Sequence, residues 1–260
     1  MMHPLQHRTD PPAGHPWSPP AGISRRNHAL RRAGQDLVGI EGRVLEAGAG
    51  TARFLRALRG INPGIAPVAC DLVLDGLQHA QREDPAVMAA QADLTALPFR
   101  AGAFKAALVF DVLEHLQRPE QAIAEIWRVL EPGGRLHALV PCEGQPLTLH
   151  WLMWKTGVGA DIKERSVGHV QRFTHGSVLT LLRAQGFTVS GVSYSMHPLG
   201  QMKDVLLHLE DDRRLPGWLS RNPLYRTVNR GLWVGAFVES ALLARVPLSA
   251  VALHLTAVKR

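Results

Sequence analysis

From Gly42 onward, short aliphatic and β-branched runs alternate with segments of helical periodicity, and this alternation strongly constrains the fold. We expect strands at residues 43–47, 67–71, 86–93, 105–111 and 135–141, with two more at 187–195 and 250–258. Strands that alternate with helices are typical of a parallel sheet covered by helices on both faces. The sequence therefore predicts a doubly wound α/β fold.

The helical segments are defined to different degrees. One helix is expected to begin at Pro119 and to end at the "EPGG" turn, and another to run from the N-cap Thr174 to Gly186. A first helix is expected within residues 24–38, outside the core fold, and residues 203–246 predict two or three helices. Residues 143–173 show no clear periodicity, so we expect them to be irregular.

Composition and charge narrow the function classes. Residues 1–140 carry 15 Lys and Arg against 14 Asp and Glu, whereas residues 141–260 carry 14 against 8, so the net charge of +7 lies mostly in the C-terminal half. The basic residues are scattered, which favours solvated faces over a nucleic-acid site. The two cysteines, Cys70 and Cys142, form no CxxC pair, so we expect no disulfide framework and no metal site.

Targeting signals are not evident in the sequence. Residues 1–22 contain six prolines and predict a flexible leader, not a signal peptide. The uncharged run from Val246 to Val258 is shorter than the roughly 20 apolar residues of a membrane span. We therefore expect a cytoplasmic protein.

The segment "VLEAGAGTAR" places Glu46, Ala47, Gly48 and Gly50 at the end of the first predicted strand. Glycines at this point of a doubly wound sheet let the backbone approach a ligand. In a dinucleotide fingerprint counted from Gly48, the third glycine would fall at Arg53, which weakens the nicotinamide-binding alternative.

These residues, together with later motifs in the same order, resemble the class I S-adenosylmethionine-dependent methyltransferases, and among them the type 11 group of the ubiquinone and menaquinone methylation enzymes. The first motif departs from the group by having Ala52 where a third glycine is usual. The later motifs are "VACDLV", "QADLTALPF", "ALVFDVLEHL", "RVLEPGGRLHALVP" and residues 168–187, so the resemblance covers about residues 40–195.

The resemblance implies a Rossmann-like, mostly parallel seven-stranded sheet with a C-terminal helical insertion. It also implies S-adenosylmethionine as cofactor, with Asp71 accepting the ribose hydroxyls and Asp93 facing the adenine amino group. The cofactor-binding residues it implies are Glu46, Ala47, Gly48, Gly50, Asp71, Leu72, Asp93, Leu94, Asp111 and Val112. We expect residues 23–260 to form one domain, with a cofactor-binding core at 40–142 and substrate-side segments at 143–173 and 200–247.

Methyl transfer requires a positioned acceptor, and an oxygen acceptor also needs a base. His115 and His169 are the catalytic candidates, with His175 and His197 as alternatives and Glu114 as a further contact. Cys142 follows the fifth strand but has no second motif to support a cysteine nucleophile. The "FDVL" segment lacks the Asn/Asp-Pro-Pro-Tyr/Phe turn typical of adenine and glutamine N-methylation.

Residues 218–246 interleave tryptophan and leucine with arginine, a pattern typical of an amphipathic helix. It packs on the sheet edge, lines a pocket for a lipophilic acceptor, or rests on a membrane surface. We therefore predict O- or C-methylation of a small lipophilic molecule, with no nucleic-acid partner. The alternatives are an RNA- or protein-modifying methyltransferase, a nicotinamide-dependent oxidoreductase and a non-catalytic cofactor-binding module.

Overall fold

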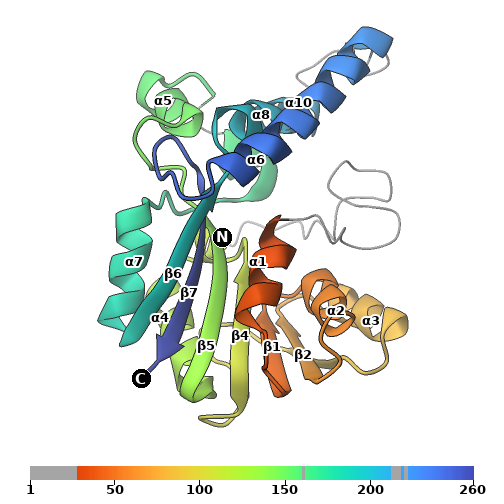
Figure 1. The fold of residues 1–260 in the computed structure, drawn as a ribbon, viewed down its shortest axis with the longest axis vertical. Helices are drawn as coiled ribbons and strands as arrows, with labels where there is room; N and C mark the ends of the chain where they lie inside the picture. The colour runs from red at the N-terminus through yellow and green to blue at the C-terminus, as the bar shows by residue number, and fades with distance from the viewer. Residues whose placement is uncertain (1–27, 160–161, 212–217, 220–221) are drawn as a thin grey trace, which may run out of the picture.

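The computed structural model describes residues 28–159, 162–211, 218–219 and 222–260, and the predicted leader at 1–22 lies outside them. Seven strands form one sheet in the order β3-β2-β1-β4-β5-β7-β6 (Figure 1). The strands β1 to β5 pair in parallel, and β7 runs antiparallel to both β5 and β6. The bounds are β1 Gly42–Ala47, β2 Ile65–Asp71, β3 Met88–Gln91, β4 Phe104–Phe110, β5 Leu130–Pro141, β6 Phe187–Ser195 and β7 Ala252–Lys259. The predicted mostly parallel seven-stranded sheet is confirmed.

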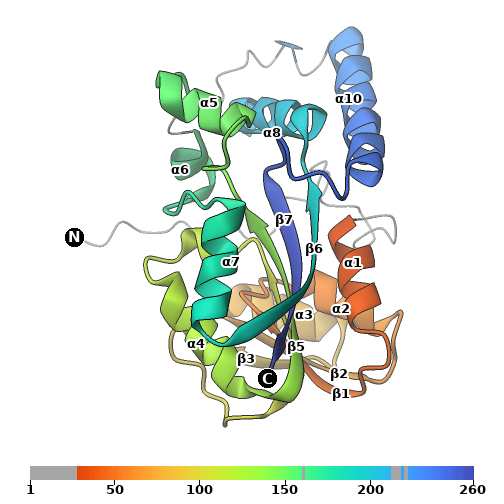
Figure 2. The ribbon, with the colours of Figure 1, turned by 60° about the vertical axis from the view of Figure 1, so that its left-hand side comes forward.

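Helices cover both faces of this sheet, as the alternation predicted. One face carries α1 (His28–Asp36), α2 (Arg53–Arg59) and α3 (Leu74–Glu83), and the other carries α4 (Pro119–Val129) and α7 (His175–Ala184) (Figures 1 and 2). Neighbouring strand residues divide between the two cores: Val44 packs with α1 to α3, and Leu45 packs with α4 and α7. This division follows from the period of two along a strand.

The first helix differs from its prediction. We expected it outside the core fold, but Leu30 and Ala33 are buried against α2 and the sheet. Asp36, at the end of α1, bonds with its Oδ2 to His137 Nδ1 on β5 and Thr256 Oγ1 on β7. The apolar stripe of α1 therefore belongs to the core.

The helix ends at α4 and α7 follow local chemistry. Pro119 opens α4, where its missing N–H leaves no intrahelical bond unmade, and α4 ends at Val129, just before the "EPGG" segment. The Thr174 hydroxyl accepts the Ser177 N–H at 3.1 Å, and the Ser177 hydroxyl accepts the Thr174 N–H at 2.9 Å. Gly186, with φ of +97°, ends α7 in the left-handed region. Both predicted helices are confirmed.

Beyond the carboxyl ends of the parallel strands lie further helices (Figure 2). They are α5 (Leu149–Thr156), α6 (Ile162–Val167), α8 (Pro198–Asp211) and α10 (Pro223–Leu242). We name α5, α6 and α8 the cap. The expectation that residues 143–173 are irregular is wrong, because α5 and α6 form there; their few buried apolar residues left no strong periodicity. Among the described residues, no helix is long and apolar enough to span a membrane.

Candidate functional site

The loop after β1 is held by a buried carboxylate. Glu46 is nearly inaccessible, and its Oε2 accepts the backbone N–H of Leu55 at 3.0 Å in the first turn of α2. A carboxylate at this helix end satisfies a donor that has no partner within the helix. The preceding loop turns at Gly48 and Gly50, with φ of +73° and +50°. Glu46 therefore fixes how the glycine loop joins α2.

The loops after β1 and β4 touch at Gly48. A Cβ on Gly48 would lie 2.4 Å from Val112 Cγ2, which is closer than two carbons can approach. Gly50 has nothing within 4 Å of the position where a Cβ would lie, so its backbone borders open space. The glycine at 48 is required for packing, whereas the side of Gly50 on which a Cβ would lie is open.

At the end of β2, the Asp71 carboxylate binds the glycine loop directly. Its Oδ2 accepts the Gly50 N–H at 2.7 Å and its Oδ1 accepts the Val73 N–H at 2.9 Å. A carboxylate has about four acceptor positions, so each oxygen can accept one more donor. The neighbouring Leu72 side chain is 53% exposed and offers an apolar surface beside these positions.

Asp93 and Asp111 follow β3 and β4 at the same edge of the sheet. Asp93 Oδ1 accepts both the backbone N–H and the hydroxyl of Thr95 at 2.8 Å, and these bonds lower the pKa of Asp93. Asp111 adopts a left-handed φ of +52°. Desolvation by the surrounding protein raises the pKa of Asp111, and the positive charge of Arg53 partly opposes this increase. The Leu94 side chain is buried in the core, so only its backbone can face a ligand.

We call the set at this edge the strand-end site; its members are Glu46, Ala47, Gly48, Gly50, Asp71, Leu72, Asp93, Leu94, Asp111 and Val112. It lies on either side of the switch between β1 and β4, where doubly wound sheets bind ligands. The open space at Gly50 and the unused acceptor positions of Asp71 suit a ligand that carries neighbouring hydroxyl groups. A nucleoside ribose has such hydroxyls, so the residues present fit the predicted cofactor.

Next to the strand-end site, the structure brings Glu114, His115 and His169 together, and we call these three the histidine cluster. Glu114 Oε1 lies 3.8 Å from His115 Nε2 and 3.8 Å from His169 Nε2. Burial and the nearby Asp111 raise the pKa of Glu114 well above its usual value. Desolvation and the neighbouring His169 lower the pKa of His115 to about 4, so this imidazole is neutral at pH 7.

The other candidate nucleophile and bases lie elsewhere. His197 is wholly buried and its Nε2 bonds the Val246 carbonyl at 2.9 Å, while His175 packs on Tyr194. Cys142 is buried, and desolvation raises the pKa of its thiol, so the thiolate needed for nucleophilic attack is disfavoured. Neither histidine belongs to the histidine cluster.

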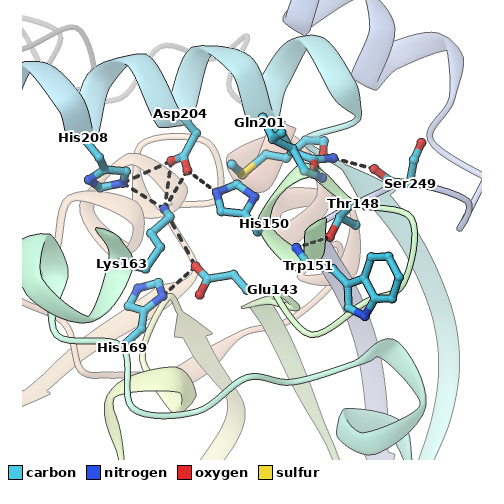
Figure 3. Close-up of polar contacts among 12 residues, drawn as sticks. Glu143, Thr148, His150, Trp151, Lys163, His169, Gln201, Asp204, His208 and Ser249 are labelled. Carbon is cyan, nitrogen blue, oxygen red and sulfur yellow. Dashed lines mark hydrogen bonds and ion pairs between the residues drawn. The ribbon is translucent and has the colours of Figure 1, made fainter. Parts of the chain in front are cut away.

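Sequence reasoning missed a set of charges behind His169, which we call the buried ion network: Glu143, His150, Lys163, Asp204 and His208 (Figure 3). His169 Nδ1 bonds Glu143 Oε1 at 2.8 Å, and Lys163 Nζ lies 3.9 Å from the same oxygen. Lys163 Nζ also lies 2.8 Å from Asp204 Oδ2. The network thus joins the cap to His169.

Mutual pairing keeps this network charged. Burial alone would raise the pKa of Asp204, but Lys163 and His150 hold it well below its usual value. Burial would lower the pKa of Lys163, yet the Asp204 and Glu143 carboxylates raise it. A weak signal was available in the sequence, because Asp204 and His208 are four residues apart within an otherwise leucine-rich helix.

The amphipathic segment forms α10, which packs mainly on α8 and also contacts β6, the edge strand of the sheet (Figure 1). The Glu239 carboxylate accepts the N–H groups of Leu199 and Gly200 at the start of α8. On another side of α10 an apolar stripe is exposed, and we call it the α10 stripe; its members are Leu224, Val228, Val234, Val238 and Leu242.

Comparison with known proteins supports the fold. Residues 45–138 match the family model described as "Methyltransferase domain". A demethylmenaquinone methyltransferase of Renibacterium salmoninarum is 36% identical over 108 residues, covering 41% of this chain and 45% of that protein. A ubiquinone/menaquinone biosynthesis C-methyltransferase of Cereibacter sphaeroides is 33% identical over 114 residues, covering 42% and 43%. The match spans less than half the length of these relatives.

Solved structures agree over a longer stretch. A crystal structure described as a sarcosine dimethylglycine methyltransferase from Galdieria sulphuraria shares 14% identity with this chain at a TM-score of 0.60. The alignment covers 89% of this chain and 83% of that one. The [4+2]-cyclase SpnF shares 23% identity at a TM-score of 0.58, covering 88% and 79%. At these identities the likeness shows the fold alone, and the cyclase is an example of another reaction on that fold.

Proposed function

We propose that the chain is a class I S-adenosylmethionine-dependent methyltransferase of the type 11 group, as the match of residues 45–138 to the methyltransferase domain model supports, and that it methylates a small lipophilic molecule. The acceptor atom is an oxygen or a carbon. The observation that carries the proposal is the Asp71 carboxylate, which is bonded to the glycine loop and keeps acceptor positions for a ribose.

We infer a role for each polar residue of the strand-end site. Glu46 secures the loop that receives the amino-acid end of the cofactor, and Gly50 offers backbone to it. Asp71 accepts the ribose hydroxyls, and Asp93 faces the adenine amino group. Asp111 and Val112 border the cofactor from the loop after β4, since Val112 already touches Gly48.

S-Adenosylmethionine held by the strand-end site would supply an electrophilic methyl group to an electron pair of the acceptor and would leave as the neutral thioether. An oxygen acceptor would lose its proton to a base, and the partly exposed His115, neutral at pH 7, is a candidate for that base. The protein's main task is to hold donor and acceptor in line.

Two observations support a lipophilic acceptor. The relatives matched over residues of the core are named for menaquinone and ubiquinone methylation. In addition, α5 of the cap exposes Leu152 and Trp154. Apolar side chains around a few polar groups are typical of sites for small lipophilic molecules.

Isothermal titration with S-adenosylhomocysteine tests the proposal. The wild-type chain should bind it, and Asp71→Asn should bind about 100-fold more weakly, because two charge-assisted hydrogen bonds are each weakened. The exposed Glu120→Gln on α4 serves as a matched control and should leave the affinity unchanged. Equal affinities of wild type and Asp71→Asn would contradict the assignment.

Parallel arms separate the alternatives. Binding of NADH without S-adenosylhomocysteine would favour an oxidoreductase. Strong, salt-sensitive RNA binding would favour an RNA-modifying enzyme. Cofactor binding without turnover of quinol, phenol or enol acceptors would favour a non-catalytic module, or a reaction of another kind on the same fold.

We further propose that the α10 stripe contacts a membrane surface from which a lipophilic acceptor is taken. Leu224 and Leu242 at its two ends are 72% and 78% exposed, and Arg226 and Arg230 lie on the same helix. An apolar face next to basic residues is typical of helices that lie on anionic membranes. Within the described part of the chain, each side chain of the stripe is between 47% and 78% exposed.

Co-sedimentation with phosphatidylglycerol vesicles at low salt tests this contact. Wild type should pellet with the vesicles, and Leu224→Glu with Val228→Glu should remain in solution. Ile61→Glu is the control, because Ile61 is an exposed aliphatic residue in the loop after α2 and does not belong to the α10 stripe. This variant should pellet like wild type. A wild-type chain that stays in solution would overturn the proposal.

A further inference from the structure

Glu114 lies in an unusual environment for a carboxylate. Its side chain is fully buried, and within the described part of the chain neither Oε1 nor Oε2 has a hydrogen-bond partner. His115 Nε2 and His169 Nε2 both lie 3.8 Å from Oε1. A buried carboxylate without donors is strongly destabilising unless something compensates it.

The two histidines cannot compensate it as neutral rings, because their protons are placed on the other nitrogens. His169 Nδ1 faces Glu143 Oε1 at 2.8 Å, and a carboxylate accepts, so Nδ1 carries the hydrogen. His115 Nδ1 faces the Gly168 carbonyl at 3.3 Å, which also only accepts. Each Nε2 is therefore left with a lone pair, 3.8 Å from Glu114 Oε1. Three acceptor atoms meet there, and either a proton on Glu114, in line with its raised pKa, or a bound cation would compensate them.

We propose that the histidine cluster is a binding site for a divalent transition-metal ion, held by Glu114 Oε1, His115 Nε2 and His169 Nε2. Two imidazoles and one carboxylate are a common ligand set for Zn²⁺, Fe²⁺ and Co²⁺ with positions left open. The three ligand atoms already lie within 4.8 Å of one another. Bonds of about 2.0–2.2 Å place neighbouring ligands about 3–3.5 Å apart. The two pairs of Glu114 with a histidine, at 3.8 Å, therefore need to contract by some tenths of an ångström, and the two histidine nitrogens by at most about 1.3–1.8 Å.

The surroundings of the cluster match those of known metal sites. A ligating histidine usually donates its second N–H to a carboxylate or a carbonyl, which fixes the ring and raises its basicity. Glu143 does this for His169 and the Gly168 carbonyl does it for His115. Glu143 is in turn held near Lys163 of the buried ion network (Figure 3).

The site is closed on one side and open on the other. Glu114 is fully buried and the His169 side chain is 8% exposed, but the His115 side chain is 35% exposed. A ligand can therefore reach the ion from the side of His115. Resting on the proposed function, we infer that an oxygen of the methyl acceptor takes this open position, which selects acceptors with an ionisable hydroxyl such as a phenol or enol. A bound ion would lower the pKa of that hydroxyl, so its proton would pass to water, and His115 would serve as a ligand in place of a base.

Titration of the chelator-treated full chain with Co²⁺, followed by visible absorption and by calorimetry, tests the site. Wild type should bind one Co²⁺ with an absorption band, and His169→Ala and His115→Ala should each weaken binding by about 100-fold or more, beyond the 10–100-fold typical of losing an outer partner. The exposed His79→Ala on α3 is the matched control and should bind like wild type. Glu143→Gln should weaken binding by about 10–100-fold.

Two outcomes overturn the site: wild type binds no Co²⁺, or the cluster variants bind it as tightly as wild type. Since His115 is partly exposed, His115→Ala should fold normally even if a change at a buried position does not, and circular dichroism checks this. S-Adenosylhomocysteine binding, measured on the same samples, separates the two proposals. Cofactor binding without Co²⁺ binding refutes only the metal site, and the reverse refutes only the methyltransferase assignment.

Discussion

Alanine at position 48 would add a methyl group where the loops after β1 and β4 meet. The added Cβ would lie 2.4 Å from Val112 Cγ2 and 2.9 Å from Val112 Cγ1. Gly48 also has a φ of +73°, a region that side-chain-bearing residues disfavour. Gly48→Ala therefore combines backbone strain with a steric clash.

The two contributions can be separated with Gly39. Its φ of +74° matches that of Gly48, but nothing lies within 4 Å of the position where its Cβ would be. Left-handed backbone costs a non-glycine residue about 1–2 kcal/mol, which is the whole effect expected for Gly39→Ala. Overpacking costs about 1–3 kcal/mol more, so Gly48→Ala should lower the free energy of unfolding by about 2–5 kcal/mol.

Val112→Ala removes both methyl groups that clash. In a double-mutant cycle, Gly48→Ala and Val112→Ala should show a favourable coupling of about 1–3 kcal/mol, equal to the overpacking contribution. Urea unfolding followed by circular dichroism measures each free energy. Equal losses for Gly39→Ala and Gly48→Ala, or strictly additive effects in the cycle, would refute the reasoning.

Three further predictions concern buried groups. Removing one partner of the Lys163–Asp204 pair should cost about 3–5 kcal/mol, and Lys163→Met with Asp204→Leu should cost less than either single change, as measured by urea unfolding. Burial lowers the pKa of His254 well below 6.5, so the unfolded chain takes up a proton there before the folded chain does, and the free energy of unfolding should fall as pH falls below 6.5. Burial raises the pKa of the Cys70 thiol to about 12 and that of Cys142 likewise upward, so iodoacetamide at pH 8 should label neither before urea is added, as mass spectrometry would show.

Each of these has a control or a contrary result. A double change at the ion pair that costs as much as the two single changes together would show that no pairing exists. His254→Gln should flatten the pH dependence of stability between pH 7.5 and 5, whereas the exposed His79→Gln should not alter it. Rapid alkylation of Cys142 in the folded chain would contradict its burial.

The strand ends and helix caps could be predicted because their determinants are local. Thr174 and Gly186 mark the limits of α7 through hydrogen bonds and backbone geometry within a few residues. The apolar strands are short and contain few charges, so the sheet follows from their alternation with helices. The order of the motifs along the sequence also predicted that the turn at Gly48 lies next to β2.

The errors have a different physical origin. The arginines of α1 suggested a solvated helix, but Leu30 and Ala33 supply the apolar face that packs on α2. The short helices α5 and α6 bury little apolar surface, so periodicity gave no signal for them. Tertiary packing, not local preference, decides these elements.

The buried ion network was also outside the reach of sequence patterns. A lysine such as Lys163 normally lies at the surface, and only the approach of Asp204, 41 residues later, makes its burial tolerable. His115 and His169 were found as single candidates, but their convergence on Glu114 depends on the path of residues 168–173 across the sheet end. Pairing at long range is set by the fold.

The division of charges suggests that cofactor and acceptor are handled by separable parts of the molecule. Asp71 is anchored by the N–H groups of Gly50 and Val73, which lie in the loops after β1 and β2. His169 is anchored through Glu143 to Lys163 and Asp204, which belong to α6 and α8. A change in the cap therefore reaches the histidine cluster before it reaches the cofactor, so Asp204→Asn should alter Co²⁺ affinity while leaving S-adenosylhomocysteine affinity unchanged. Parallel loss of both affinities in that variant, with the chain still folded, would show that the two parts are not separable.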